Sequence, residues 1–157
     1  MRYSGLQVTF QEIPNEICLS IHISGCPLSC PGCHSVDLKN KGLGLVLNPS
    51  AFEKLIHKYK NYITCIVFMG GEWHLESLID HLVIAKSFDL KTALYTGLEY
   101  DQVPSRLLSK LNYLKVGPFV ARLGGLDSIK TNQKLIDLKE NKIIKKNKEE
   151  VYYEVFK

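Results

Sequence analysis

The 157-residue sequence has no long hydrophobic run. No apolar stretch reaches the roughly 18–20 residues that a bilayer-spanning helix requires. The first residues, Met1 to Gln7, contain no apolar core of signal-peptide length. We therefore expect a cytoplasmic protein that is not exported and has no membrane partner. Hydrophobic residues make up 45% and charged residues 23% of the chain, which argues against a disordered chain, a collagen or a coiled coil.

The sequence also lacks an internal repeat and any linker rich in Pro, Gly or Ser. A chain of this length usually forms one domain. We therefore expect a single domain over residues 1–157. Its core should cover about residues 5–138, followed by a C-terminal extension over about residues 139–157.

Charge of one sign is in small excess. The 20 basic and 16 acidic residues give a formal net charge of +4, which requires no nucleic-acid partner, and we expect none. From Lys130 to Lys157 there are eight Lys against five Asp or Glu. This segment is interpreted either as a solvated hairpin or as a basic docking edge, and the sequence leaves both open.

Apolar patterns predict four strands with three helices between them. Residues 17–23 alternate strictly, with Ile17, Leu19, Ile21 and Ile23 on one face, which is typical of a strand. A capping box at Ser50–Glu53 predicts the start of the first helix. The expected order is strand 17–23, helix 50–59, strand 64–69, helix 75–83, strand 91–96, helix 101–111 and strand 113–116.

This alternation predicts the fold class. Strand–helix repeats form right-handed units with a parallel sheet, and about four units fit before residue 118. A complete eight-unit barrel needs about 250 residues, so we predict an α/β fold with an open or partial parallel βα barrel. Short strands at 134–138, 142–145 and 151–156 are expected as a C-terminal β hairpin extension at one edge.

The cysteines are odd in number and unevenly spread. There are five, and three of them lie within eight residues. A secreted disulfide scaffold would carry an even and dispersed set, and clustered thiols in a reducing compartment favour a metal centre. Cys18 and Cys65 lie inside predicted strands, so we expect them in the core.

The other three cysteines, Cys26, Cys30 and Cys33, follow the spacing C-x3-C-x2-C directly after the first predicted strand. Sites form at this end of the strands in parallel α/β folds. Three thiolates can bind three irons of a [4Fe–4S] cluster, and no fourth cysteine follows nearby. One iron would keep an open position, which is typical of a catalytic metal centre.

Zinc is the alternative for this loop. Cys26, Cys30 and Cys33 together with His34 or His22 would provide a Cys3His set. Structural zinc usually takes two separated ligand pairs rather than one triplet. The spacing therefore favours the cluster and leaves zinc as the second interpretation.

The cysteine spacing resembles that of the radical S-adenosylmethionine (SAM) superfamily. Met69-Gly70-Gly71-Glu72, after the second predicted strand, resembles the superfamily's Gly-Gly-Glu motif for the SAM amino group. The short chain, Cys33-His34-Ser35, Leu94-Tyr95-Thr96-Gly97 and the Gly-rich segment after Lys115 resemble the small activating enzymes of anaerobic ribonucleoside-triphosphate reductase. The resemblance covers about residues 5–138.

The resemblance implies two cofactors, a [4Fe–4S] cluster and SAM, and no catalytic side chain beyond them. Cys26, Cys30 and Cys33 would be the cluster ligands. Many superfamily members carry an aromatic residue before the third cysteine, where this sequence has Gly32, so an adenine contact there would come from the backbone. The residues expected to contact SAM or to lie beside the cluster are Gly70, Gly71, Glu72, Thr96, Lys115 and His34.

Three further residues are assigned from their positions in the sequence. Arg122 is a further candidate for the SAM carboxylate. His22 shares a strand face with Cys18 and Ser20, and we expect that face to point toward the cluster. Trp73 is expected to pack over the entrance of the site.

The implied function is the activation of another enzyme. A reduced electron donor such as flavodoxin would reduce the cluster, and cleavage of SAM would give a 5′-deoxyadenosyl radical. That radical would take a hydrogen atom from a glycine of anaerobic ribonucleoside-triphosphate reductase, the protein partner. We expect the segment from Gly117 to Gln133 to border the open side of the sheet and to contact the partner's glycine loop, because long aperiodic loops are more often functional.

Two other functions remain open. The chain can be a radical SAM activase of another glycyl-radical enzyme, or a radical SAM enzyme that acts on a small molecule. Several other activases add a ferredoxin-like insert with more cysteines, for which this sequence has none to spare. From a different class, it can be a zinc-stabilised binding module that uses its basic tail.

Overall fold

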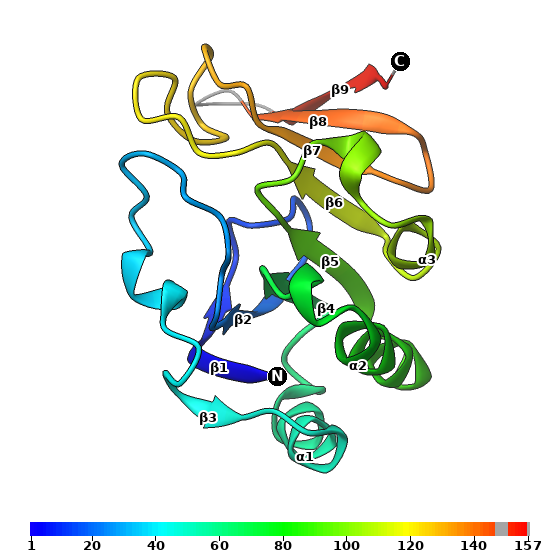
Figure 1. Ribbon diagram of the computed structural model, residues 1–157. Coiled ribbons are helices and arrows are strands. Elements are labelled where there is room, and N and C mark those ends of the chain that lie inside the picture. Colours follow the sequence, from blue (N-terminus) through cyan, green and yellow to red (C-terminus); the bar gives the residue numbers. More distant parts are fainter. Residues whose placement is uncertain (147–150, 157) are drawn as a thin grey trace.

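The computed structural model describes residues 1–146 and 151–156, and a single large sheet forms its centre (Figure 1). Among these residues the strands are β1 (Arg2–Thr9), β2 (Cys18–Ile23), β3 (Leu45–Val46), β4 (Cys65–Met69), β5 (Lys91–Tyr95), β6 (Tyr113–Val116), β7 (Lys134–Asp137), β8 (Lys142–Lys146) and β9 (Val151–Val155). The helices are α1 (Pro49–Tyr59), α2 (Leu75–Ser87) and α3 (Ser105–Leu108), with 3-10 turns η1 (Val36–Lys39), η2 (Glu72–His74) and η3 (Tyr100–Gln102).

The four predicted strands form the parallel centre of the sheet, as expected. β2 pairs with β4, β4 with β5 and β5 with β6, all in parallel. In this register Ser20 lies opposite Val67, and Val67 lies opposite Ala93. The carboxyl ends of β2, β4, β5 and β6 therefore lie along one edge of the fold.

The whole sheet is mixed and open. Its strand order is β3-β1-β2-β4-β5-β6-β7-β8-β9, so β3 and β9 are its edges among the described strands. The sheet therefore takes the open form of the prediction, and the described strands do not close into a barrel. The predicted C-terminal strands are present and pair antiparallel, β7 with β6, β8 with β7 and β9 with β8. Residues 147–150 and Lys157, part of the charged C-terminal segment, lie outside the described residues.

Two strands were missed by the sequence analysis. β1 pairs antiparallel with β2, and β3 pairs antiparallel with β1. No side chain of β1 is fully buried and both residues of β3 are exposed, so neither segment carries the apolar pattern of a buried strand. β1 continues the sheet beyond the parallel strands and covers the outer edge of β2.

The predicted helix boundaries need two corrections. Helix α1 begins at Pro49, and the side chain of Asn48 caps it by accepting from the backbone N–H of Ala51 at 2.8 Å. The capping box at Ser50 is therefore wrong, because proline favours the first helical position and fixes an earlier start. The helix predicted at 101–111 is also wrong as one element, since η3 and the four-residue α3 are separated by Pro104.

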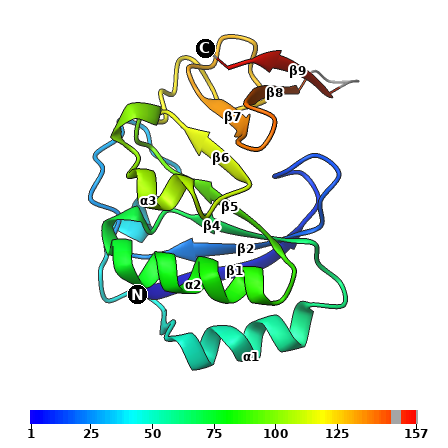
Figure 2. The same cartoon turned by 90° about the vertical axis from the view of Figure 1, so that its right-hand side faces the viewer.

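The two faces of the sheet carry separate cores. Leu19, Ile21 and Ile23 of β2 pack in the core that contains Phe52 of α1 and Leu78 of α2. Figures 1 and 2 show α1 and α2 side by side along this face. The opposite face packs the fully buried residues Cys18, Cys65, Val67 and Ala93 together with Leu135. The predicted division of β2 into two faces and the core positions of Cys18 and Cys65 are confirmed.

A buried carboxylate ties the amino ends of the parallel strands together. Glu16 is 6% exposed and precedes β2. It accepts hydrogen bonds from Thr64 Oγ1 at 2.7 Å and Tyr113 OH at 3.1 Å, and it forms an ion pair with Lys91. This bond to Glu16 is the main cause that raises the pKa of Lys91. A buried charge is tolerated when it is paired and hydrogen-bonded, and Glu16 meets that condition.

Within the described ranges, no helix has the length and apolar character needed to cross a membrane.

The buried histidine of α2 predicts acid sensitivity. His81 is fully buried, its Nδ1 bonds to the Ser77 carbonyl, and it packs on Phe52 with ring centroids 4.9 Å apart. Burial lowers the pKa of His81 below its ordinary value. The stability that the neutral imidazole contributes is therefore present above about pH 6.5, the unfolded pKa, and is lost as the pH falls.

We therefore expect His81→Leu to lose less unfolding free energy than the unsubstituted chain when the pH falls from about 7 to 5. Urea unfolding at both pH values measures this difference. Equal losses in the two proteins would show that His81 does not cause the acid sensitivity.

Candidate functional site

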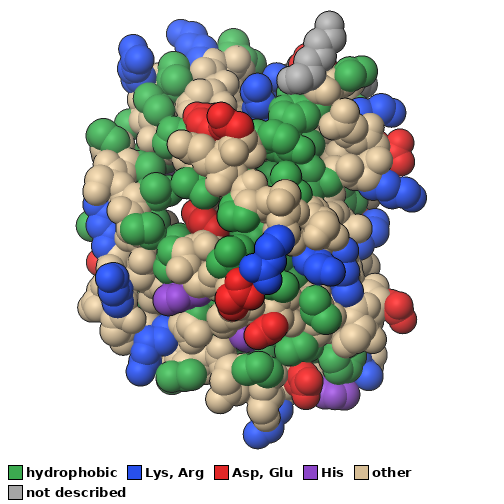
Figure 3. Space-filling model, turned by 45° about the vertical axis from the view of Figure 1, so that its right-hand side comes forward, with side chains coloured by type: hydrophobic (Ala, Val, Ile, Leu, Met, Phe, Trp, Pro, Cys, Tyr) green, Lys and Arg blue, Asp and Glu red, His purple; other side chains and the backbone are tan. Residues whose placement is uncertain are grey.

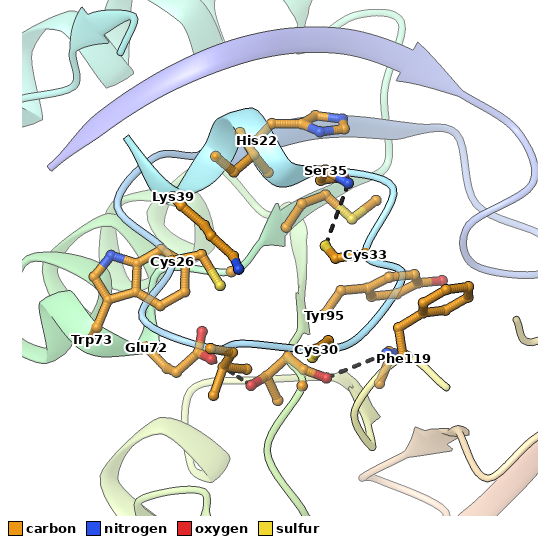
Figure 4. Close-up of a pocket in the computed structure, with 17 residues that line it drawn as sticks. His22, Cys26, Cys30, Cys33, Ser35, Lys39, Glu72, Trp73, Tyr95 and Phe119 are labelled. Carbon is orange, nitrogen blue, oxygen red and sulfur yellow. Dashed lines mark hydrogen bonds between the residues drawn. The ribbon is translucent and has the colours of Figure 1, made fainter. Parts of the chain in front are cut away.

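A cavity of about 230 Å³ lies at the carboxyl ends of the parallel strands (Figure 4). His22 and Met69 line it from β2 and β4, Tyr95 from β5 and Lys115 from β6. The cysteine loop closes one side. The complete lining is His22, Cys26, Leu28, Cys30, Cys33, Ser35, Leu38, Lys39, Met69, Gly70, Glu72, Trp73, Tyr95, Thr96, Gly97, Lys115 and Phe119.

The three clustered cysteines all face this cavity. Cys26, Cys30 and Cys33 are free thiols and partly exposed. Backbone bonds shape their loop, because the carbonyl of Leu38 accepts from the N–H of Gly25 at 2.6 Å and of Cys26 at 2.9 Å. The loop turns back where the N–H of Cys33 donates to the Cys30 carbonyl at 3.2 Å. The backbone therefore holds the three thiols around one space.

Two features affect individual thiols in the loop. The N–H of Ser35 donates to Cys33 Sγ at 3.4 Å and fixes the direction of that side chain. Burial raises the pKa of the Cys26 thiol, and the nearby Glu72 carboxylate raises it further. Cys26 therefore favours the neutral thiol unless a cation or a metal compensates for the cost of its charge.

The Gly70-Gly71 turn positions Glu72. Both glycines have positive φ, +80° at Gly70 and +113° at Gly71, a region that other residues rarely adopt. A Cβ at Gly70 would lie 2.5 Å from Cη2 of Trp73, so the indole ring packs directly on this glycine. Gly70 lines the cavity, whereas Gly71 lies behind it against Ile23.

Glu72 is a partly buried residue whose carboxylate has one oxygen without a hydrogen bond among the described residues. Its Oε1 accepts from Thr96 Oγ1 at 2.6 Å, while its buried Oε2 has no hydrogen-bond partner within residues 1–146 and 151–156. Burial raises the pKa of Glu72 despite the Thr96 hydrogen bond. Buried polar atoms are nearly always paired, so an unpaired one in a cavity indicates a missing ligand group.

Lys115 brings a positive charge to the same cavity. It is 9% exposed, and its Nζ donates to the Gly117 carbonyl at 3.0 Å and to the Thr96 carbonyl at 3.4 Å. Burial lowers its pKa to about 8, although Cys30 and Glu72 act in the opposite direction. The cavity thus contains a carboxylate and an ammonium, the pair that complements the ammonium and carboxylate of an amino-acid ligand.

Of the remaining residues proposed from the sequence, two line the cavity and two lie outside its lining. His22 lines the cavity, as expected from its strand face, and Trp73 packs at its margin. His34 is exposed and lies outside the lining, but its ring is 4.6 Å from that of Phe119, which does line the cavity. Arg122 is exposed and is not part of the lining.

Sequence analysis missed several lining residues. Lys39 lies on η1 and extends into the cavity near Cys26, as Figure 4 shows. Tyr95 and Leu38 contribute from a strand end and a loop turn. Phe119 was part of a recognised segment but was given no role. Of these residues, only Tyr95 could have been predicted from the sequence, because it directly precedes Thr96 at the end of a predicted strand. The loop residues carry no periodic pattern from which their positions could be predicted.

The spacing of the metal-binding side chains can be compared with the needs of a zinc site. Among residues 1–146 and 151–156, no three His, Cys, Asp or Glu side chains lie close enough to bind one metal ion. A zinc site needs all its ligands within about 2.0–2.3 Å of a single ion. A cluster instead takes one thiolate at each of several irons, and three thiols that border one cavity are compatible with that arrangement.

Comparison with known protein families identifies a match over most of the chain. A family model described as a 4Fe-4S single cluster domain matches residues 17–145. This range contains β2 to β7, the cysteine loop and every residue that lines the cavity. No curated protein and no solved structure matches the chain.

The contact between Gly70 and Trp73 gives a test of the turn. Gly70→Ala would place a Cβ against the indole ring and force a side chain onto a positive φ, which costs on the order of 1–3 kcal/mol. We expect a loss of unfolding free energy in that range and a change in the emission of Trp73, the only tryptophan.

Gly42→Ala is the control, because its φ is not in the positive region and its nearest neighbour, Asn40 Oδ1, would be 3.4 Å away. If both variants unfold at the same urea concentration with unchanged emission, the contact between Gly70 and Trp73 does not constrain the turn.

Proposed function

Because the chain belongs to the 4Fe-4S single cluster domain family, which is typical of radical SAM activating enzymes, we propose that it activates anaerobic ribonucleoside-triphosphate reductase. Its substrate would be a glycine in a loop of that reductase, and its product a glycyl radical. The membership supports an iron–sulfur enzyme of the radical SAM type. The choice of reductase rests on the resemblance of the Leu94–Gly97 and Lys115–Gln133 segments described above.

One observation carries the proposal. Three thiols of one loop border the same cavity as Glu72, whose Oε2 is buried and unpaired. A structural cysteine site would have no use for an unpaired carboxylate beside it. A cluster that shares its space with an amino-acid ligand accounts for both features.

The proposed cluster ligands are Cys26, Cys30 and Cys33. Three ligands for four irons leave one iron for the methionine part of SAM. When both are bound, the cluster and SAM supply one-electron cleavage of the sulfonium carbon–sulfur bond. The role of the chain is to bind, orient and shield these groups.

Charged groups of the chain would orient SAM. Glu72 Oε2 would accept a hydrogen bond from its ammonium, while Thr96 holds the other oxygen in place. Lys115 would pair with the SAM carboxylate. Gly70 permits close backbone approach, and Gly71 sets the turn from which Glu72 extends.

Apolar side chains would exclude water from the reaction. Leu28, Met69, Tyr95 and Phe119 form much of the lining between the charged groups. Trp73 closes the cavity at one margin (Figure 4). His34 supports Phe119 from outside through its ring contact, so we propose a supporting role for His34 rather than direct contact with SAM.

The segment from Gly117 to Gln133 is the proposed docking surface for the partner loop. It contributes Phe119 to the cavity, and a Cβ at Gly32 would lie 3.1 Å from Ala121. The segment therefore packs against the cysteine loop at the margin of the site. A cytoplasmic flavodoxin-like protein is the proposed electron donor.

The decisive test is anaerobic mixing of the cluster-loaded chain with the reductase, SAM and a chemical reductant. We expect a glycyl radical on the reductase by electron paramagnetic resonance, and none with Cys30→Ala. Cleavage of SAM without a radical on this reductase would contradict the choice of partner but not the radical SAM activity. A radical on another glycyl-radical enzyme would then identify a different activase, and turnover of a small molecule would identify a small-molecule enzyme.

The cluster assignment predicts a sharp division among the five cysteines. Cys26→Ala, Cys30→Ala and Cys33→Ala should each lose cluster iron and sulfide after anaerobic reconstitution, because each removes one of three ligands. Cys18→Ala and Cys65→Ala should retain both, because these thiols are fully buried in the sheet. Retention of iron in Cys30→Ala with loss in Cys65→Ala would overturn the assignment.

The unpaired oxygen predicts the effect of Glu72→Gln. A charge-assisted hydrogen bond contributes about 1.5–3 kcal/mol, so SAM affinity should fall by roughly 10- to 100-fold with cluster iron unchanged. A SAM titration followed in the cluster's absorption spectrum measures this, with the exposed Glu53→Gln as control. An unchanged dissociation constant would make Glu72 a structural residue.

A further inference from the structure

A second cavity shares one lining residue, Trp73, with the cysteine site. Its volume is about 520 Å³. Three cationic or titratable basic side chains face it, and no Asp or Glu among the described residues lines it. The complete lining is Met1, Arg2, Gly25, Pro27, Lys41, Val46, Trp73 and His74.

The basic groups of this cavity crowd one another. Burial lowers the pKa of His74, and the amine of Met1 and the ammonium of Lys41 lower it further. The Arg2 guanidinium is fixed by one N–H, which donates to the Gly44 carbonyl at 2.6 Å, so its other N–H groups remain available. Like charges at close range repel, and an anion among them would relieve that repulsion.

This arrangement differs from that of three basic side chains elsewhere in the described residues. Lys91, Arg106 and Lys145 each pair with a glutamate. On the face drawn in Figure 3, basic and acidic side chains are interspersed. The second cavity instead gathers Arg2, Lys41 and His74 around a concave space without an acid in its lining.

We propose that this cavity binds a phosphate-bearing anion. Arginine, lysine and histidine supply the N–H donors that bind phosphate oxygens, and arginine can do so with two parallel bonds. The volume is more than tenfold what a cavity needs to hold one water, so it admits a group larger than a single phosphate. Trp73, Val46 and Pro27 give the cavity an apolar wall for the organic part of a nucleotide.

Trp73 links the two cavities. It lines both, its Nε1 donates to the Ser24 carbonyl at 3.3 Å, and its ring lies on Gly70 beside Glu72. An anion in the second cavity would therefore contact the residue that borders the cysteine site. Because Trp73 is the only tryptophan, its fluorescence reports occupancy directly.

The test uses inorganic pyrophosphate and ATP, each without divalent metal and at constant ionic strength. Calorimetry with the cluster-loaded chain should give one saturable site for pyrophosphate, and titration of the cluster-free full chain should change Trp73 emission. Lys41→Gln and His74→Gln should each weaken binding roughly tenfold or more, the loss of a charge-assisted bond. Lys86→Gln, which removes an exposed lysine of α2, should leave affinity unchanged.

The outcomes separate the sources of the anion. Saturable binding of pyrophosphate with weaker binding of ATP would assign a free phosphate anion, and tighter binding of ATP would assign a nucleotide. Equal affinities in Lys41→Gln and Lys86→Gln, or the absence of saturation, would overturn the proposal. Tighter binding of an octaglutamate peptide than of either phosphate compound would also overturn it, because the surface would then suit an acidic protein segment.

Discussion

Parallel pairing of β2, β4, β5 and β6 decides which side chains of this protein can meet. In a parallel register all four strands end at the same edge. The cysteine loop follows β2 and the Gly70–Glu72 turn follows β4, while Thr96 and Gly117 come directly after β5 and β6. Segments separated by up to about ninety residues therefore line one cavity, because the backbone hydrogen bonds fix the parallel register of the four strands.

Two glutamates, the buried Glu16 and the partly buried Glu72, have different roles at the two ends of the sheet. Glu16 at the amino ends is paired with Lys91, Thr64 and Tyr113. Glu72 at the carboxyl ends has one bonded and one unbonded oxygen. Complete pairing of a buried charge favours the fold, whereas an incomplete set at a cavity leaves binding energy available for a ligand.

The sequence predicted the parallel centre and the site motifs because both depend on local patterns. Apolar runs such as Thr64–Met69 identify buried strands, and the cysteine spacing needs no tertiary information. β1 and β3 were not predicted because strands without fully buried side chains lack a clear apolar pattern. Asn48 displaced the expected cap at Ser50 because Pro49 fixes the first turn, and Lys39 joins the site only through the path of its loop.

The Glu16 network lies at the opposite end of the strands from the cysteine loop, and this separation has an evolutionary consequence. Loops at the carboxyl ends can accumulate substitutions that alter recognition, while the amino ends continue to hold the strands in register. The C-terminal strands add to the sheet beyond β6 and lie outside the parallel units. Substitutions in them can therefore also alter recognition without disturbing the parallel strands. New specificities can therefore arise on this scaffold without renewed selection for a folded chain.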